Sequence, residues 1–442
     1  MKTSHFKTVI FAALLLPTVA LAQQTISGTF SPASDFTYAF LYRATPTGPI
    51  YVDRSELTEE GGFEITLDSS ASKGIYKIVY ATPPEEFNFD LMYNGNEDVV
   101  LNFDAEKGLE FIQSKDNKLW TSYTSSIDMV NRTISNYYTK QSSDKKAFAG
   151  IFKTLESTQQ AFEEASKGKI SHTFITANRP YVPRSYEDLS TYSKHLKLNY
   201  LNHVDFSDQL LQSSDFLSER ALTYVFGMPG SSNPEEQRKA IDHLVGKMEG
   251  INPIVKTTIL VKVWQEFAET ENKEMSDYLI DNYLLNLAKQ TDNGALADQL
   301  NSYRNTTIGT KAPDFTLSSP VETANKGKTL YDLNEEKSYL LIFWSSGCSH
   351  CLDELPKVKN LLKSNPNIQV VAFGLEDDDK NWSREIKKYP DFIHVLGLGK
   401  WENTTAKTYG ISGTPSYFML DSNKVITAKP FDYEALKELL NQ

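Results

Sequence analysis

The fold of the C-terminal region follows from the stretch FWSSGCSHC at residues 343–351, where an apolar run leads directly into two cysteines. Residues 338–344 form a continuous apolar run, as expected of a strand that is buried on both faces. The elements predicted after it are a helix that begins near the cysteines, a buried strand at 368–374, a hairpin over 416–420 and 425–428, and a closing helix that includes 433–440. Residues 309–442 are therefore predicted to form an α/β domain.

Cys348 and Cys351 are the only two cysteines of the 442-residue chain, and their C-x-x-C spacing at a strand-to-helix turn indicates redox chemistry. Unpaired N–H groups and the dipole at a helix N-terminus favour a thiolate over a thiol. We predict that Cys348 is the exposed nucleophile and Cys351 the resolving thiol. A zinc site would need more ligands, covalent haem would need a histidine where the chain has Leu352, and so short a disulfide loop would add little stability.

Further segments give residues 309–442 a resemblance to a known family. Residues 309–315 (GTKAPDF) are similar to the family's opening segment, Pro356 to a proline that bends the active-site helix, and residues 409–415 (YGISGTP) to a loop that holds a cis-proline. With the stretch at 343–351, they resemble periplasmic thioredoxin-like proteins of the TlpA/ResA type, in the AhpC/TSA–redoxin superfamily. The resemblance implies a thioredoxin-like fold.

The resemblance also implies roles for single residues. Thr414–Pro415 would be a cis peptide bond that faces Cys348 and leaves the Thr414 backbone free to pair with an extended substrate. Glu354, one helical turn after Cys351, corresponds to a glutamate that moves protons to and from the resolving thiol. The alternative is that Glu354 is a solvated surface charge. Because the redox-active disulfide of the two cysteines carries the chemistry, no cofactor and no metal are expected.

Two positions depart from the family pattern. Gly347 stands where a tryptophan usually precedes the first cysteine, which puts an aromatic docking surface in doubt. His350 replaces the proline before the second cysteine, as in the oxidase DsbA, and is expected among the residues that meet the substrate. A cationic imidazole there would stabilise the reduced form. We therefore predict a reduction potential between those of thioredoxin, about −270 mV, and DsbA, about −120 mV.

The first 22 residues are typical of a cleaved secretory signal. Lys2 and Lys7 give a positive start, an apolar run too short to span a membrane follows, and residues 20–22 (ALA) supply small side chains for cleavage. Position 23 is Gln23 rather than a cysteine, so a lipoprotein signal is not predicted. The mature protein is therefore expected to be soluble in the periplasm.

Two regions lie between the signal and the α/β domain. Residues 23–115 alternate apolar and polar side chains, which predicts an antiparallel, sandwich-like β domain with a hairpin turn at Asn94-Gly95. This region resembles the small all-β domain that precedes such modules in exported proteins of the Bacteroidota. Residues 116–308 change to a helical period and predict an all-α region. The chain is thus expected to be multi-domain.

Charge and composition limit the partners. The net charge of −12 disfavours nucleic acid, because binding to phosphates needs a basic surface. The histidines of the helical region lack the spacing of metal ligands. The acidic run at residues 376–379 (EDDD) is predicted to be a solvated loop rather than a cation site.

These features together predict an exported thiol–disulfide oxidoreductase. Its expected partners are a disulfide-bearing protein substrate and a membrane thiol electron donor. Reduction is the direction that the resemblance implies, and cytochrome c maturation is a narrower form of that role. The alternatives are a periplasmic disulfide oxidase or isomerase, and a binding module with a redox-switch domain. A thiol peroxidase is disfavoured, because residues 343–347 lack the Pro and Thr that it needs upstream of its cysteine.

Overall fold

The computed structural model describes residues 24–84, 86–230, 232–320, 327–333 and 336–441. The predicted secretory signal lies outside these residues. The chain divides into two compact units, residues 1–217 and 218–442, and each is described by itself. The division falls inside the region that we predict to be helical. Among the described helices, each is too short or too polar to cross a membrane.

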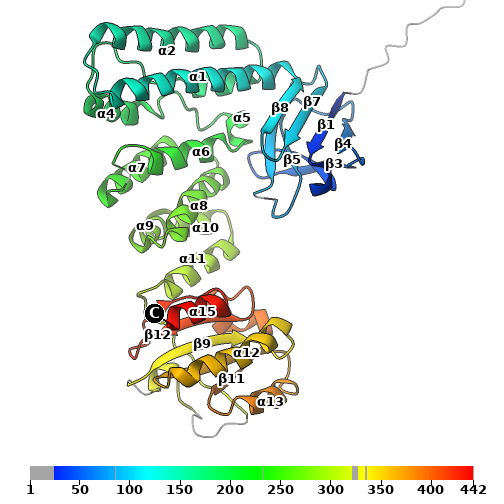
Figure 1. Cartoon of the computed structure of the whole chain (residues 1–442), viewed down its shortest axis with the longest axis vertical. Coiled ribbons are helices and arrows are strands. Elements are labelled where there is room, and N and C mark those ends of the chain that lie inside the picture. Colours follow the sequence, from blue (N-terminus) through cyan, green and yellow to red (C-terminus); the bar gives the residue numbers. More distant parts are fainter. Residues whose placement is uncertain (1–23, 85, 231, 321–326, 334–335, 442) are drawn as a thin grey trace, which may run out of the picture. The chain divides into compact units, whose positions relative to one another are not determined.

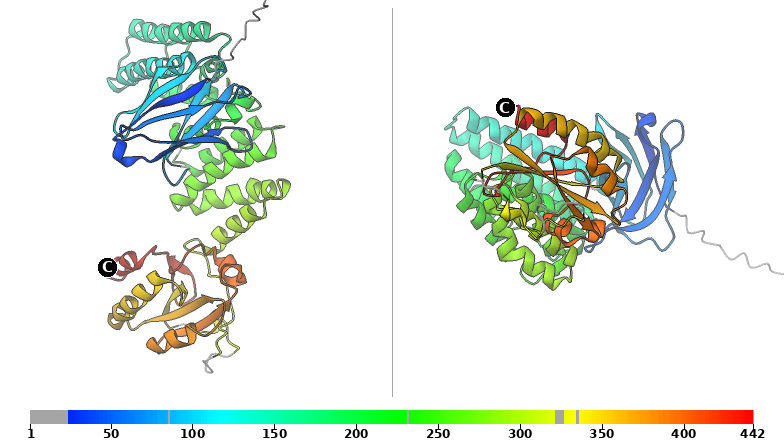
Figure 2. Two further views of the ribbon diagram at one scale, coloured as in Figure 1. Left: turned by 90° about the vertical axis from the view of Figure 1, so that its right-hand side faces the viewer. Right: turned by 90° about the horizontal axis from the view of Figure 1, so that it is seen from below.

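A β-sandwich forms the start of the first unit (Figures 1 and 2). Its strands are β1 Thr25–Ser31, β2 Tyr38–Arg43, β3 Ile50–Glu56, β4 Gly62–Thr66, β5 Gly74–Val79, β6 Asn88–Tyr93, β7 Val99–Asp104 and β8 Gly108–Gln113. One four-stranded sheet has the order β4-β1-β7-β8 and the other the order β3-β2-β5-β6. Buried side chains of both sheets, such as Ile26 and Leu41, share one core, so the predicted sandwich is present.

Two details of the sandwich differ from the prediction. β1 runs parallel to β7, with Ile26 opposite Val99, so the domain is not purely antiparallel. The Asn94-Gly95 turn does not close a hairpin, because β6 and β7 on either side of it belong to different sheets. The Asn94 side chain accepts a hydrogen bond of 2.9 Å from the backbone N–H of Asn96. The hairpin prediction was wrong because Asn-Gly specifies a tight turn but not which strands pair.

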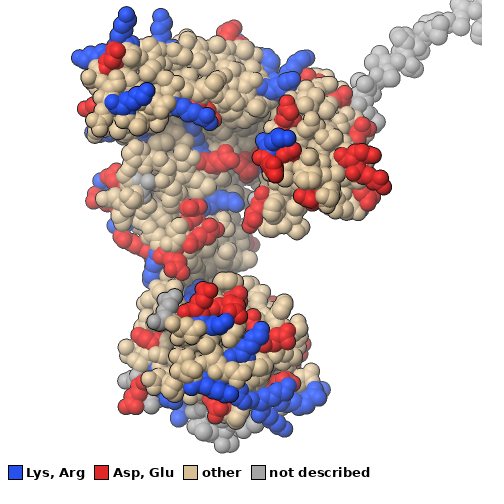
Figure 3. Space-filling view, viewed as in Figure 1, with Lys and Arg blue, Asp and Glu red and all other residues tan. Residues whose placement is uncertain are grey.

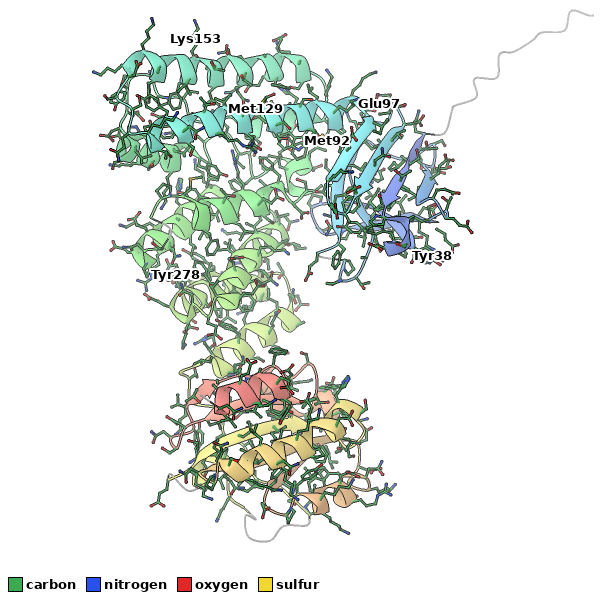
Figure 4. All side chains as sticks on the ribbon, viewed as in Figure 1. Tyr38, Met92, Glu97, Met129, Lys153 and Tyr278 are labelled. Carbon is green, nitrogen blue, oxygen red and sulfur yellow. The ribbon has the colours of Figure 1, made fainter. Side chains whose placement is uncertain are left out.

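Helices follow the sandwich in the first unit. They are α1 Lys115–Thr139, α2 Lys145–Ser166, α3 Ser171–Ala177, α4 Leu189–Asn199, α5 Gln209–Gln212 and α6 Phe216–Leu222, within which the unit ends. The Asn117 side chain of α1 bonds both backbone groups of Met92, at 2.8 and 2.7 Å. Glu97 accepts a 2.6 Å hydrogen bond from the N–H of Lys115, and Figure 4 shows Met92 and Glu97 beside the start of α1. These contacts fix α1 on the sandwich.

The second unit begins with helices, the last of which packs on the C-terminal domain. They are α7 Pro234–Lys247, α8 Pro253–Glu269, α9 Lys273–Leu279, α10 Leu285–Gln290 and α11 Gly294–Thr306. Ser302 of α11 donates a 2.7 Å hydrogen bond to the carbonyl of Lys407 in the C-terminal domain. Gly410, with a φ of 67°, permits this approach, because a Cβ there would lie 3.0 Å from the Cβ of Ser302. The all-α character predicted for this part of the chain is confirmed.

The C-terminal domain is built on one five-stranded sheet of order β11-β10-β9-β12-β13. Its elements are β9 Ser338–Trp344, α12 Ser349–Leu361, β10 Ile368–Glu376, α13 Trp382–Glu385, β11 Ile393–Leu398, α14 Thr404–Tyr409, β12 Ser416–Leu420, β13 Ile426–Ala428 and α15 Tyr433–Leu440. β9, β10 and β11 are parallel, whereas β12 and β13 are antiparallel to their neighbours. This is the α/β thioredoxin-like arrangement predicted from the sequence.

Each face of this sheet has its own core, because alternate residues of β9 point to opposite sides. Leu341 and Phe343 pack on the side of α14. Ile342 and Trp344 pack on the side of α12 and α15. Figure 1 shows α12 and α15 beside the central strand β9. A strand enclosed in this way explains the continuous apolar run that precedes the cysteines.

Figure 3 shows acidic and basic side chains interspersed on the visible surface of both units.

Candidate active site

Cys348 is the N-cap residue of α12. Its Sγ accepts a hydrogen bond of 3.2 Å from the backbone N–H of Cys351, where capping residues usually present an oxygen. Its thiol donates to the carbonyl oxygen of Thr414, at an Sγ–O distance of 3.2 Å. Cys348 is only partly buried and stands at the N-terminus of α12. An accessible sulfur is what attack on a disulfide requires.

Cys351 lies one turn into α12 and is 0% exposed. It packs among Trp344 and Leu355 in the core between α12 and the sheet. Burial, together with the hydrogen bond to Cys348, raises the pKa of the Cys351 thiol to about 12. Both cysteines are free thiols in this structure. A buried, protonated thiol beside a surface thiol is the arrangement in which the second sulfur acts only after the first has formed a bond to substrate.

The loop before β12 faces the cysteines. The Thr414–Pro415 peptide bond is cis, and Thr414 is the residue whose carbonyl accepts the hydrogen bond from Cys348. Thr414, Pro415 and Ser416 are all partly exposed. Ser416 leads into β12, which pairs with β9, so the loop is held at the same edge of the sheet as the cysteines. An extended peptide that reached Cys348 would meet this backbone.

Glu354 lies on α12, one turn beyond Cys351, and is partly buried rather than fully solvated. Its Oε2 accepts a hydrogen bond of 2.6 Å from the phenol of Tyr417. Tyr417 is 2% exposed, and its burial, together with the hydrogen bond to Glu354, raises the pKa of this phenol. Sequence reasoning missed Tyr417, because a tyrosine in an apolar strand is indistinguishable from an ordinary core residue. The available signal was its position two residues after Pro415.

Glu376 is a second residue that the sequence analysis missed, and here the prediction was wrong. We predict residues 376–379 to be a solvated loop, but Glu376 is the last residue of β10 and is 6% exposed. Its carboxylate accepts a hydrogen bond of 2.5 Å from the backbone N–H of Ser346, in the turn before Cys348. Asp377 is exposed and pairs with Lys400 at 2.5 Å. The first residue of the acidic run is therefore buried in the domain, and only the three aspartates that follow it are solvated.

The remaining predicted site residue, His350, is exposed on the first turn of α12, as is the neighbouring Gly347 in the preceding turn. The structure therefore brings Cys348, Cys351 and Thr414 together and leaves the imidazole at the surface. Among the residues that the structure describes, no cluster of three or more His, Cys, Asp and Glu side chains is arranged to hold a metal ion.

Known proteins are similar to the part of the chain that contains the two cysteines. Residues 307–436 match the family described as Redoxin. No curated protein matches the chain. Among solved structures, a domain of a possible thiol-disulfide isomerase from Cytophaga hutchinsonii is 35% identical, with 30% of this chain and 91% of that chain covered and a TM-score of 0.26.

Two other solved structures are similar to the chain. A thiol-disulfide oxidoreductase from Bacteroides fragilis is 28% identical, covers 30% of this chain and 97% of its own length, and has a TM-score of 0.26. A thioredoxin-like protein from Bacteroides caccae is 18% identical over 59% of this chain and 96% of its own length, with a TM-score of 0.31. With its cysteine pair at the end of a central strand, the segment at 307–436 is a redoxin family domain, and through it the chain is a thioredoxin-like thiol–disulfide oxidoreductase.

Proposed function

We propose that the chain is an exported enzyme that reduces protein disulfides with Cys348 and Cys351. The observation that carries the proposal is the placement of Cys348, whose sulfur caps α12 and faces the carbonyl of Thr414 at 3.2 Å. A polypeptide paired with the Thr414 backbone would hold its own sulfur near Cys348. The buried Cys351 would then be one turn away from the bond that forms.

The proposed reaction has two displacements. The Cys348 thiolate attacks one sulfur of the substrate disulfide, which forms a mixed disulfide and releases the other substrate sulfur as a thiolate that takes up a proton. Cys351 then gives its proton to the Glu354 carboxylate and attacks the sulfur of Cys348. The second substrate sulfur leaves as a thiolate and is protonated. Two electrons have passed to the substrate, and the enzyme holds a Cys348–Cys351 disulfide.

A complete cycle needs a thiol donor that reduces this disulfide, and we assign that step to a membrane protein with an exposed thiol pair. Residues 1–22 would direct export as a cleaved secretory signal, which supports a periplasmic location. The substrate would be a protein or peptide that carries an exposed disulfide. No metal or cofactor takes part in the proposed steps.

The test uses the mature chain and its two single-cysteine variants. We expect the wild type to reduce insulin disulfides with a chemical thiol as donor, and the Cys348→Ser variant to have no activity. The Cys351→Ser variant should accumulate a mixed disulfide with the substrate, detectable by mass, because the resolving sulfur is gone. Absence of turnover by the wild type, or equal activity in the Cys348→Ser variant, would overturn the proposal. A reduction potential close to that of DsbA, about −120 mV, would instead identify an oxidase.

A further inference from the structure

We propose that Glu376 is a positioning residue for the redox pair. Its carboxylate fixes the turn that presents Cys348, and its negative charge lowers the reduction potential of the dithiol. The inference rests on the proposed function, because it concerns the direction in which the same two cysteines pass electrons.

Glu376 is the last residue of β10, the strand that runs beside β9. In the parallel pairing of β9 with β10, Gly374 is opposite Trp344, so two residues further on Glu376 comes level with Ser346. β9 has ended there, and the Glu376 side chain takes the place of a strand partner by accepting the N–H of Ser346 at 2.5 Å. Its other carboxylate oxygen lies 3.4 Å from the hydroxyl of Ser345. At 6% exposure the carboxylate is largely removed from water.

The backbone N–H groups of the turn bond either to this carboxylate or to Ser345, which contacts it. The Ser345 hydroxyl, which donates to Glu376, also accepts the N–H of Gly347 at 3.2 Å. The Ser345 carbonyl accepts the N–H of Cys348 at 3.1 Å. The three N–H groups of Ser346, Gly347 and Cys348 are therefore satisfied by Glu376 and by the serine that it holds. Loss of the carboxylate would remove the side-chain acceptor of the Ser346 N–H and the contact that holds the Ser345 hydroxyl.

The charge of Glu376 acts on the same turn. A negative charge raises the free energy of a nearby thiolate, and a thiolate exists only in the reduced protein. Glu376 therefore favours the disulfide form, which corresponds to a lower reduction potential. Lys400 also interacts electrostatically with Glu376, but it is partly exposed to solvent and makes its ion pair with Asp377, at 2.5 Å, so it offsets the charge of Glu376 only in part. This effect opposes the one we predict for His350, whose imidazole is at the surface and screened by solvent.

The experiment compares the wild type with a Glu376→Gln variant of the mature chain in glutathione buffers at pH 8. The equilibrium converts the protein dithiol and glutathione disulfide into the protein disulfide and two glutathione thiols. Glutamine keeps an acceptor for Ser346 and removes the charge. We expect the equilibrium constant for disulfide formation to fall about tenfold, equal to a potential about 30 mV higher. The shift should persist at high salt, because the carboxylate is buried.

Two further variants separate charge from folding. Asp377→Asn removes the same charge one residue later, at a side chain that is 73% exposed, and should change the constant less than about twofold. Glu376→Ala removes the acceptor as well as the charge. It should show the shift of the glutamine variant. In addition, Cys348 should form the mixed disulfide with the substrate more slowly, because the turn is no longer held.

The outcomes distinguish this inference from the proposed function. A folded Glu376→Gln variant with an unchanged constant, or the same shift in Asp377→Asn, would overturn the role of Glu376 even if the wild type reduces insulin. A shifted constant in a protein that reduces no protein disulfide would support the role of Glu376 and overturn the proposed function. A lower potential in the glutamine variant would contradict the sign of the charge effect.

Discussion

Tyr417 of β12 donates a hydrogen bond of 2.6 Å to Glu354 of α12, so a buried phenol from the strand after Pro415 holds the carboxyl that follows Cys351 by one turn. The burial of Tyr417 and its contact with Glu354 raise the pKa of the phenol, which therefore remains a donor throughout the neutral range. The bond occupies one carboxylate oxygen and fixes the direction of the other. In the proposed reaction, a proton acceptor held in this way would serve the resolving thiol without first losing rotational freedom.

The first prediction concerns Tyr417→Phe. We expect the resolution of the mixed disulfide to slow by between about threefold and tenfold, since loss of roughly 1 kcal/mol of orientation changes a rate by that amount. The step is measured in a single turnover with a preformed mixed disulfide. Tyr409→Phe is the matched control, because Tyr409 is equally buried but donates to Pro313 at 2.5 Å. Equal slowing in both variants would show that only packing was lost.

A second prediction follows from the pKa of Cys351. In the Cys348→Ser variant, alkylation of Cys351 by iodoacetamide at pH 8 should be roughly a hundredfold or more slower than that of a free thiol, because burial, the largest cause of the raised pKa, remains and leaves very little thiolate. The rate should rise about tenfold per pH unit up to pH 10 or so. The same variant unfolded in urea should level off near pH 9. A plateau below pH 9 in the folded variant would contradict the assignment.

The third prediction is a loss of stability at high pH. The folded pKa of Cys351, about 12, lies above that of an unfolded thiol, so the stabilisation is complete below about pH 8.5 and is lost as the pH rises toward 12. By pH 10 the loss should be on the order of 2 kcal/mol in the reduced protein. Urea unfolding of the wild type and of Cys351→Ala, followed by signals from the second unit, measures it. A parallel decline of both proteins would rule out Cys351 as the cause.

The fourth prediction tests the parallel contact in the β-sandwich. Gly28 of β1 faces Leu101 of β7, and a Cβ at Gly28 would lie 1.8 Å from the Leu101 carbonyl oxygen. Gly28→Ala should destabilise the first unit by at least about 2 kcal/mol, because backbone cannot yield as a side chain can. Gly150→Ala, on α2 with open space around it, should stabilise the same unit by roughly 0.5–1 kcal/mol. Calorimetry of both variants checks the opposite signs.

The thioredoxin-like domain was predictable because its signals are local. The apolar run at 338–344 has to be a strand enclosed on both faces, and the structure shows Trp344 fully buried at its end. The spacing of Cys348 and Cys351 needed only the helix that follows. Each of these inferences depends on residues close together in the chain, so neighbouring sequence was sufficient.

The residues that the sequence did not reveal act across the sheet. Glu376 and Ser346 are 30 positions apart, and Tyr417 and Glu354 are 63 positions apart. Within its own segment, Glu376 is simply the first of four acids, and Tyr417 is one apolar residue among several. Their roles arise from strand register, which is set by the whole domain. The Asn94-Gly95 turn failed as a hairpin for the same reason, because pairing between sheets is a long-range property.

Strand β1 cannot complete its backbone pairing until β7 has been synthesised. Thr29 and Asn102, whose side chains are joined by a 2.7 Å hydrogen bond, are 73 positions apart in the chain. While the polypeptide is being made, one edge of β1 therefore exposes unpaired backbone groups until the seventh strand emerges. Such an edge is a template for pairing with another chain. A nascent fragment that stops before residue 99 would be prone to aggregate as well as incomplete. The unpaired edge of β1 is where a chaperone that binds unfolded chains would act.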